Sequence, residues 1–225
     1  MIDQPFALFR PHADVLSISM LTKEDCVKTD SEAMTILKIR NAASIKQSHG
    51  NVTVVTRDAG LEQAVADGIA TDRAGLTLFV RAADCQLFVA YDPVAKITGL
   101  LHAGWRGLVA GAIEEFVSTL STVLSADPAR LLVGAAPSLC TKCAEFTDPA
   151  RELPSIDPRF FHGRNVNLQG IADAEFLRLG ILPGHLERHP DCTRCRTEKY
   201  WSYRGEGEAV KEGYRNMLIC SLRGK

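Results

Sequence analysis

The stretch ADCQLFVAYDPVAKITGLLHAGWRG, residues 83–107, contains two apolar runs separated by the turn signal Asp92-Pro93. The runs cover residues 86–91 and 97–103, and both are rich in aliphatic and β-branched side chains. Runs of this length on either side of a short turn are typical of a β-hairpin. The stretch therefore predicts two adjacent antiparallel strands that carry chemically reactive residues at their open end.

Cys85 comes just before the first predicted strand, and His102 lies near the end of the second. If the turn is centred near residue 94, Cys85 lies opposite Ala103 and His102 lies opposite Gln86. A one-residue change of register, or one bulge, would place Cys85 directly across from His102, and bulges are common beside active sites. Opposed side chains on one face lie roughly 5 Å apart, which suits two ligands of one metal ion.

His49 is the candidate third ligand, because it comes just before a β-branched run and is followed by Gly50, which permits a sharp turn. Two histidines and one cysteine form a reasonable zinc set that leaves a fourth position for water or substrate. The alternatives are ordinary ones. A cysteine in an apolar run is commonly a small core residue. A histidine at a strand end is commonly a hydrogen-bonded group without a metal.

Composition points to an ordinary globular enzyme or binding domain. The chain has 225 residues, of which 46% are hydrophobic and 24% charged, so we expect one domain over residues 1–225. The net charge is −1 with no long basic run, which argues against nucleic acid or an anionic membrane as the partner. With no visible signal peptide and an odd count of seven cysteines, we expect a reducing cytoplasm. Separately, we expect a monomer or a homodimer.

The predicted elements alternate irregularly, which favours an α+β fold over a doubly wound one. Apolar periodicity predicts one amphipathic helix over 108–124 and another over 167–180. Strands are predicted at 51–56, 75–80 and 130–137, in addition to the hairpin. Residues 59–71 look like turn material, and the tail after Glu198 predicts an aromatic strand, a glycine-rich loop and a last apolar element. Residues 1–45 are harder to interpret, with an early strand and part of a helix expected there.

The segment after the hairpin offers a second kind of site, for an oxyanion. Gly104 and Gly107 allow close backbone approach, and Arg106 supplies a fixed positive charge. A helix that starts near Leu108 would present unpaired N–H groups at its beginning, and together these groups could hold phosphate. In the alternative, Arg106 is a solvated loop residue and Trp105 anchors the core.

Two further motifs, CTKC at 140–143 and CTRC at 192–195, place four cysteines in CxxC pairs. Two such pairs can form a structural zinc site with four cysteine ligands. Their separation is longer than in an ordinary zinc finger, and no basic helix follows, so thiols that simply pack in the core are the default expectation.

Four segments resemble, in order and spacing, the laccase-domain family, also called the multicopper polyphenol oxidase or YfiH-like family. They are SHGNVTVV (48–55), ADCQLFVAYDP (83–93), LLHAGWRGLVAGAIEEFV (100–117) and YWSYR (200–204). The resemblance covers about residues 46–222 and leaves 1–45 as a divergent N-terminal segment of the same domain. It implies a single α+β domain with layered mixed β-sheets flanked by helices.

The resemblance also implies an activity. Members of the family resemble zinc-dependent purine nucleoside phosphorylases, which also deaminate adenosine and cleave methylthioadenosine. The implied substrates are adenosine, inosine or guanosine together with phosphate, and the products are a purine base and ribose 1-phosphate. The implied metal ligands are His49, Cys85 and His102, and the implied cofactor is zinc.

Other residues receive roles by their place near these motifs. Asp84 could orient a ligand or shuttle a proton, or could simply cap a turn at the hairpin edge. Arg106 and Gly107 are candidates for phosphate binding. Tyr203 and Arg204 could stack on the purine or bond to it, or could be ordinary strand residues. The sequence departs from the family where Ala135 follows Gly134 and where Tyr214 precedes Arg215.

Two rival functions remain open at this point. Copper also binds histidine and cysteine, so a laccase-like polyphenol oxidase is one alternative. The six histidines, however, include none of the His-x-His pairs expected of a multicopper oxidase. The other alternative is a non-catalytic zinc-binding module built on the CxxC pairs.

Overall fold

The computed structural model describes residues 1–62 and 64–224 and contains two large β-sheets packed face to face. The first sheet has the spatial order β1 (Ile2–Asp3), β2 (Leu16–Leu21), β13 (Asn216–Leu222), β6 (Thr77–Ala82) and β3 (Ala42–Ser44). The second has the order β12 (Leu186–Arg188), β9 (Leu132–Ala135), β7 (Gln86–Asp92), β8 (Ile97–Ala103), β5 (Gly68–Thr71) and β4 (Thr53–Val55). Both sheets mix parallel and antiparallel pairs.

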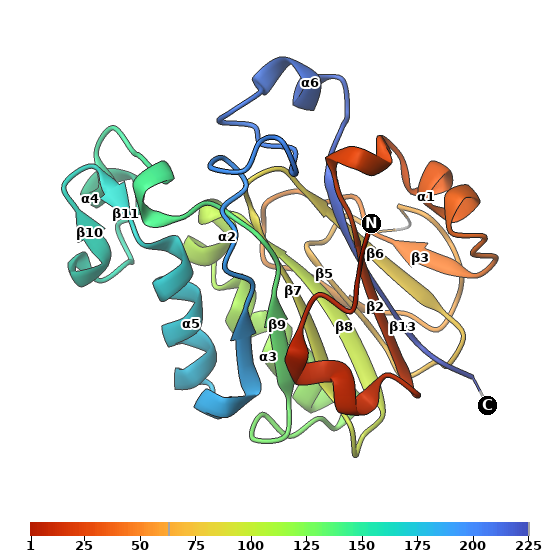
Figure 1. Cartoon of the computed structure of the whole chain (residues 1–225). Helices are drawn as coiled ribbons and strands as arrows, with labels where there is room; N and C mark the ends of the chain where they lie inside the picture. The colour runs from red at the N-terminus through yellow and green to blue at the C-terminus, as the bar shows by residue number, and fades with distance from the viewer. Residues whose placement is uncertain (63, 225) are drawn as a thin grey trace.

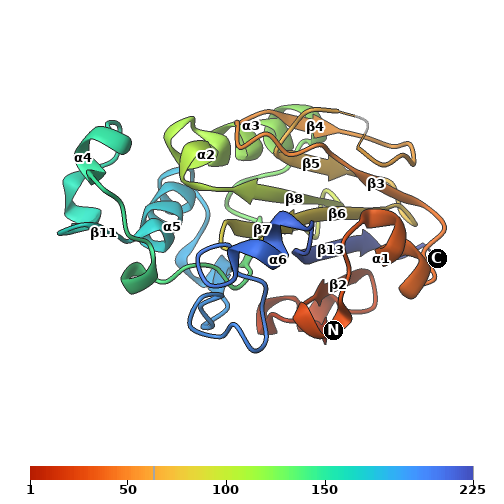
Figure 2. The same cartoon turned by 90° about the horizontal axis from the view of Figure 1, so that it is seen from above.

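The molecule is layered, as the resemblance implied (Figures 1 and 2). Strands β6 and β13 pack on β7 and β8, with Val89 and Leu100 in the shared core. The opposite face of β7 and β8 is covered by α3 (Ala112–Leu124) and α5 (Leu168–Arg178), where Phe88 meets Phe176. The helix α1 (Asp30–Ile36) packs on the outer face of the first sheet. The α+β prediction with layered mixed sheets is therefore confirmed.

The hairpin forms as predicted, but with a different register. Leu87 lies opposite His102 and Gln86 lies opposite Ala103, so His102 is not opposite Gln86 as the turn near residue 94 implied. Neither predicted alternative, Cys85 opposite Ala103 or opposite His102, is observed. Because side chains alternate along a strand, Cys85 shares a face with Leu87 and therefore with His102, as a diagonal neighbour. Both faces of the hairpin are buried. A slip of one residue would move the side chains of one strand to the opposite face, so packing fixes this register.

The segment predicted as one helix over 108–124 is two helices. The short α2 (Trp105–Val109) starts earlier than Leu108, and α3 starts at Ala112 after a break at Gly111. Gly111 has φ of +78°, a left-handed conformation that glycine adopts without strain. The expectation that a helix begins near Leu108 is therefore wrong.

Other differences concern the least patterned segments. The predicted turn region 59–71 contains the strand β5, and residues 199–203 form a loop instead of an aromatic strand. The predicted strands at 51–56, 75–80 and 130–137 and the helix at 167–180 are confirmed within a few residues by β4, β6, β9 and α5. The N-terminal segment supplies β2, which pairs with β13 along its whole length.

Four shorter elements lie outside the layers. The helix α4 (Pro149–Glu152) and the hairpin of β10 (Phe161–His162) and β11 (Asn165–Val166) form a satellite beside α5 (Figure 1). The helix α6 (Gly207–Lys211) lies beyond one end of the sheets, the end where β7 begins and β8 finishes. None of the helices formed by the described residues combines the length and apolar character needed to cross a membrane.

The core between α3 and the second sheet should contribute strongly to stability. Phe116 is fully buried there, so Phe116→Ala should lower the free energy of unfolding by about 3–5 kcal/mol through lost burial and the cavity left behind. Val123→Ala is the matched control on the same helix, because Val123 is exposed, and it should change stability by less than about 0.5 kcal/mol. Urea unfolding followed by circular dichroism measures both. Equal effects of the two substitutions would contradict this assignment of the core.

Candidate metal centre

His49, Cys85 and His102 come together at the end of the hairpin. One potential ligand atom from each lies within 4.8 Å of the others. His102 is buried near the end of β8, Cys85 precedes β7, and His49 is exposed on the loop before β4. The two imidazole rings stand almost perpendicular, with centroids 4.8 Å apart. The structure thus places the three residues singled out from sequence within reach of one ion.

Asp67 organises this centre, and the sequence did not single it out. Its fully buried carboxylate accepts a hydrogen bond from His102 Nδ1 at 2.8 Å. It also accepts from the backbone N–H groups of Ser48, His49 and Gly50 and from the Ser48 hydroxyl, at 2.7–3.3 Å. One carboxylate therefore fixes both the His49 loop and the His102 ring.

The position of Asp67 follows from sheet pairing. Strand β5 runs antiparallel to β8 with Gly68 opposite Leu101, so Asp67 faces His102, whose N–H donates to the Asp67 carbonyl at 2.8 Å. The only sequence signal is an aspartate directly before a short strand, in a segment predicted to be turn material. A carboxylate recruited through sheet pairing leaves no local spacing pattern.

The hydrogen bond to Asp67 determines which His102 nitrogen is available. With Nδ1 bonded to Asp67, Nε2 is free to face Cys85 and a metal, the arrangement found in carboxylate–histidine–zinc sites. His49 adopts the left-handed region with φ of +62°, which is uncommon for a residue other than glycine. The hydrogen bonds from Ser48, His49 and Gly50 to Asp67 hold the loop in that conformation.

Burial and hydrogen bonding oppose each other in the pKa values of the centre. Burial favours the neutral acid at Asp67, but the hydrogen bonds from His102 and Gly50 outweigh it and lower the pKa to about 2. Burial also raises the pKa of Cys85, yet bonds from His102 and His49 lower it to about 6. Burial lowers the pKa of His102, but Asp67 and Cys85 raise it to about 9. Without metal, these shifts favour a Cys85 thiolate beside a His102 imidazolium near pH 7 to 8.

Gly104 leaves the space in which the ligands meet. A Cβ atom at this position would lie 2.8 Å from Cys85 Sγ and 3.2 Å from His49 Cδ2. Gly107 serves packing instead, because a Cβ there would lie 3.1 Å from the carbonyl oxygen of Gly50. Gly107 therefore lets α2 approach the His49 loop closely. Gly107 is not among the residues that line the cavity described below.

Asp84, proposed from sequence as a ligand-orienting group or a proton shuttle, makes two hydrogen bonds to loops. Its Oδ1 accepts from the Thr193 hydroxyl and its Oδ2 from the Arg204 backbone N–H, both at 2.7 Å. The carboxylate is buried, and its residue has φ of +88°. This geometry favours a positioning role for Asp84, beside the ligand Cys85.

A cavity of about 700 Å³ opens directly on the three ligands. Six cationic side chains line it against two carboxylates, Glu62 and Asp84, and the cations are Lys28, Lys46, Arg81, Arg106, Arg204 and Arg215. The wall is therefore positive and suits an anion.

Arg106 and Tyr203 are exposed parts of the cavity wall, and the Arg106 guanidinium lies over the Trp105 ring at 4.1 Å. Arg204 is held by the Cys143 carbonyl, at 3.3 Å, and lies over the Phe146 ring at 5.6 Å. The helix starts at Trp105 and not near Leu108, so Arg106 lies in its first turn and does not precede the helix.

Gln86 adds a polar group that sequence reasoning missed. Its Nε2 donates to the Leu168 carbonyl at 3.0 Å, which fixes the orientation of the amide. Its Oε1 is buried in the cavity wall and accepts no hydrogen bond from the described residues. A buried acceptor without a partner is costly, so this atom is suited to bind a donor group of a ligand.

Comparison with known proteins gives consistent results. Residues 16–220 match the family model described as multi-copper polyphenol oxidoreductase laccase. The chain is 32% identical over 169 residues to purine nucleoside phosphorylase ORF3 of Streptomyces griseus, covering 71% of this chain and 67% of that protein. It is 28% identical over 161 residues to adenosine deaminase RL5 of an unknown prokaryotic organism, covering 67% of this chain and 60% of that protein.

The fold is also found in a solved structure. The crystal structure of the hypothetical protein YfiH from Bacillus licheniformis superposes with a TM-score of 0.76 at 23% identity, over 85% of this chain and 79% of that one. The chain spans only 67% and 60% of the lengths of the two relatives ORF3 and RL5. The family match begins at residue 16, so it includes most of the N-terminal segment that the motifs left out.

Asp67→Asn should weaken metal binding by about 10- to 100-fold. Oδ1 accepts from His102 and His49, and Oδ2 accepts from Ser48 and Gly50, whereas an amide has only one acceptor oxygen. Competition with a chromophoric chelator measures the affinity. Asp72→Asn is the matched control, since Asp72 also lies near β5 but pairs with Arg57 at the surface. Similar affinity of the Asp67→Asn variant and the wild type would show that Asp67 does not organise the site.

Metal binding should depend on pH in a defined direction. Since His102 has a raised pKa of about 9 and Cys85 a lowered pKa of about 6, one proton must leave His102 when a metal binds between pH 7 and 9. We expect the affinity to rise by about tenfold per pH unit over this window and to level off above it. Competition titrations at pH 7, 8, 9 and 10 test this. An affinity that is constant from pH 7 to 9 would contradict the thiolate–imidazolium pair.

Proposed function

The chain belongs to the multi-copper polyphenol oxidoreductase laccase family, and we propose that it is a zinc-dependent purine nucleoside phosphorylase with adenosine deaminase as a side activity. The proposed substrates are adenosine, inosine, guanosine and methylthioadenosine, each cleaved with phosphate. Relatives named purine nucleoside phosphorylase and adenosine deaminase support a purine-processing enzyme. The observation that carries the proposal is the three-donor centre that opens into a positively charged cavity of about 700 Å³.

The donor set fits a zinc ion. Two imidazoles and one thiolate are ligands that zinc accepts, and three protein ligands leave a position open for chemistry. Gly104 keeps the space between Cys85 and His49 clear, and Asp67 presents His102 in the required tautomer. A zinc ion held there would supply Lewis-acid polarisation of a substrate atom. The family description leaves copper as the alternative metal.

The cavity can bind the two substrates together. Its volume falls within the range of about 300–1,000 Å³ that is usual for small-molecule sites. Arg106, Lys46 and Arg215 supply positive charge to hold phosphate near the ligands. Trp105, Phe146 and the exposed Tyr203 offer aromatic faces on which a purine can stack. The wall thus supplies both the cationic and the aromatic groups that phosphate and a nucleoside would require.

Phosphorolysis joins a phosphate oxygen to ribose C1′ and breaks the bond between C1′ and the purine nitrogen. The pair of electrons from that bond leaves with the base, which takes up a proton. The protein's contribution is to hold phosphate in line and to exclude water, because a water molecule in the same position would hydrolyse the nucleoside. Gln86 Oε1 can accept a hydrogen bond from an N–H group of the purine and so fix its orientation.

The test is a nucleoside panel on metal-quantified protein, with and without phosphate, read by product chromatography. Inosine should yield hypoxanthine only when phosphate is present, and adenosine should also yield some inosine. His102→Ala should lower the phosphorolysis rate at least 100-fold, because it removes a ligand. His162→Ala is the control, since His162 lies on the exposed hairpin away from the cavity.

Full activity of the His102→Ala variant would contradict the site. Turnover of a phenol by copper-loaded protein, without phosphorolysis by the zinc-loaded form, would instead favour the oxidase alternative.

A further inference from the structure

The two CxxC pairs meet outside the centre already described. Cys140 and Cys143 lie on and beside a short 3-10 turn after β9, and Cys192 and Cys195 lie on the loop after β12. The four Sγ atoms all lie within 4.8 Å of one another. Cys143 and Cys192 are buried, Cys140 is half-buried and Cys195 is exposed. Cysteines more than 50 positions apart have therefore been brought to one point by the fold.

We propose that Cys140, Cys143, Cys192 and Cys195 bind a second, structural zinc ion that joins the two loops behind one wall of the cavity. The donor set is the one that closed structural zinc sites use. Such a site has no open position, so it serves stability rather than chemistry. It is distinct in ligands and place from the centre formed by His49, Cys85 and His102.

The sulfur separations agree with tetrahedral coordination. Cys143 Sγ lies 3.5 Å and Cys140 Sγ 3.9 Å from Cys195 Sγ. Four sulfurs at about 2.3 Å from a zinc ion would be roughly 3.8 Å apart, whereas a disulfide requires about 2.05 Å. The cluster therefore has the dimensions of a metal site, and all four residues are free thiols in the structure.

Backbone N–H groups point at the cluster from both loops. The Cys140 N–H donates to Cys192 Sγ at 3.3 Å, and the Cys195 N–H is directed to the same sulfur. Within the first pair, the Cys143 N–H donates to the Cys140 carbonyl at 2.9 Å, which forms the tight turn that brings two cysteines of a CxxC motif together. Hydrogen bonds from N–H groups to sulfur stabilise thiolates, the form that binds zinc.

Charged neighbours also suit a thiolate cluster. Zinc with four thiolates carries a net charge of −2, and Lys142 and Arg194 lie between the cysteines of the two motifs. Arg204 donates to the Cys143 carbonyl at 3.3 Å, which brings a further cation near the cluster.

The cluster is connected to the cavity through Asp84. The loops meet at a bridge between Ser138 and Cys192, where the Thr193 N–H donates to the Ser138 carbonyl at 3.2 Å. The Thr193 hydroxyl bonds to the Asp84 carboxylate, and the Leu139 N–H donates to the Asp84 carbonyl at 3.3 Å. An ion that fixes these two loops would therefore hold Asp84 in place, next to the ligand Cys85.

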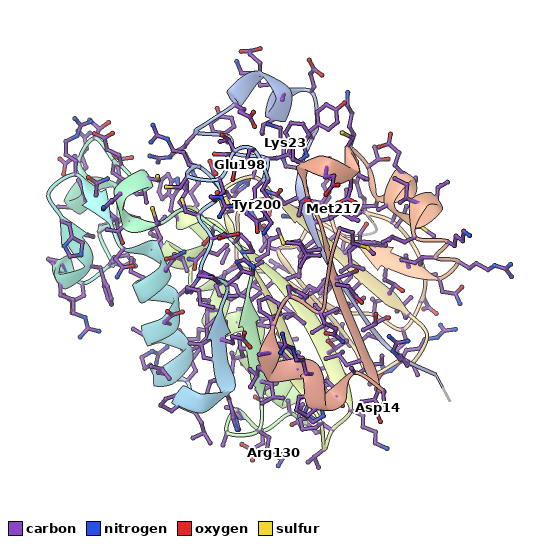
Figure 3. The ribbon with its side chains drawn as sticks, viewed as in Figure 1. Asp14, Lys23, Arg130, Glu198, Tyr200 and Met217 are labelled. Carbon is purple, nitrogen blue, oxygen red and sulfur yellow. The ribbon has the colours of Figure 1, made fainter. Side chains whose placement is uncertain are left out.

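The second loop is also anchored by a buried tyrosine. Tyr200, labelled in Figure 3, is fully buried and donates from its hydroxyl to Asp191 at 2.8 Å, one residue before Cys192. Between Thr193 and Tyr200 the loop consists of turns and a bend, without a helix or strand. A zinc ion would supply the constraint that secondary structure does not.

Metal content of the full chain tests the proposal separately from the proposed function. A variant with His49→Ala, Cys85→Ser and His102→Ala lacks the first centre and should retain one zinc per chain by elemental analysis. X-ray absorption of that variant should show four sulfur neighbours at about 2.3 Å and no nitrogen at 2.0–2.1 Å. Adding Cys192→Ser and Cys195→Ser should remove the zinc, whereas adding Cys26→Ser, an exposed cysteine elsewhere, should not.

A second measurement applies if the multiple variants fold poorly. The single substitution Cys195→Ser alters only the exposed ligand, and it should increase hydrogen exchange several-fold in residues 138–146 and 190–204, with no change in Cys26→Ser. Wild-type protein denatured with chelator should release all seven thiols to a thiol reagent. Four fewer thiols would mean that the cysteines form two disulfides, and a zinc-free triple variant with reduced cysteines would mean that they only pack. Either result overturns the proposal.

Discussion

The buried carboxylate of Asp67 is the group on which the metal centre depends, because it accepts five hydrogen bonds from two separate parts of the chain. It fixes the loop that carries His49 and orients the ring of His102. Without it, His49 would lie on an unsupported loop in a left-handed conformation, and His102 could present either nitrogen. The negative charge of Asp67 also makes His102 a stronger base, which benefits a metal ligand.

The layers explain why the centre lies at this end of the sheets. Strands β7 and β8 are buried on both faces, so the hairpin has one allowed register and its end positions are fixed. That register sets Cys85 and His102 on one face as diagonal neighbours, and Gly104 leaves room for them. The rigid hairpin supplies two ligands and the loop held by Asp67 supplies the third. Precision in such a site comes from strands more readily than from loops.

Sequence patterns predicted the features that depend on residues close together in the chain. The apolar runs gave the hairpin strands, and the motifs around His49, Cys85 and His102 pointed to three residues that the fold brings together. The register was missed by one residue, because apolar runs buried on both faces carry no polar–apolar alternation from which the register can be predicted. Asp67 was missed because its partners come through sheet pairing, which sequence spacing does not record. The break at Gly111 was missed because the apolar period continues across it.

The central claim is that one ion is held jointly by His49 on its loop and by Cys85 and His102 at the open end of the hairpin. Its most direct test is a crystal structure of the zinc-loaded chain with anomalous diffraction collected on both sides of the zinc edge. The account predicts an anomalous peak within bonding distance of Cys85 Sγ, His102 Nε2 and one His49 nitrogen, with Asp67 still bonded to His102 Nδ1. A fully loaded crystal with no peak between these three side chains would contradict it.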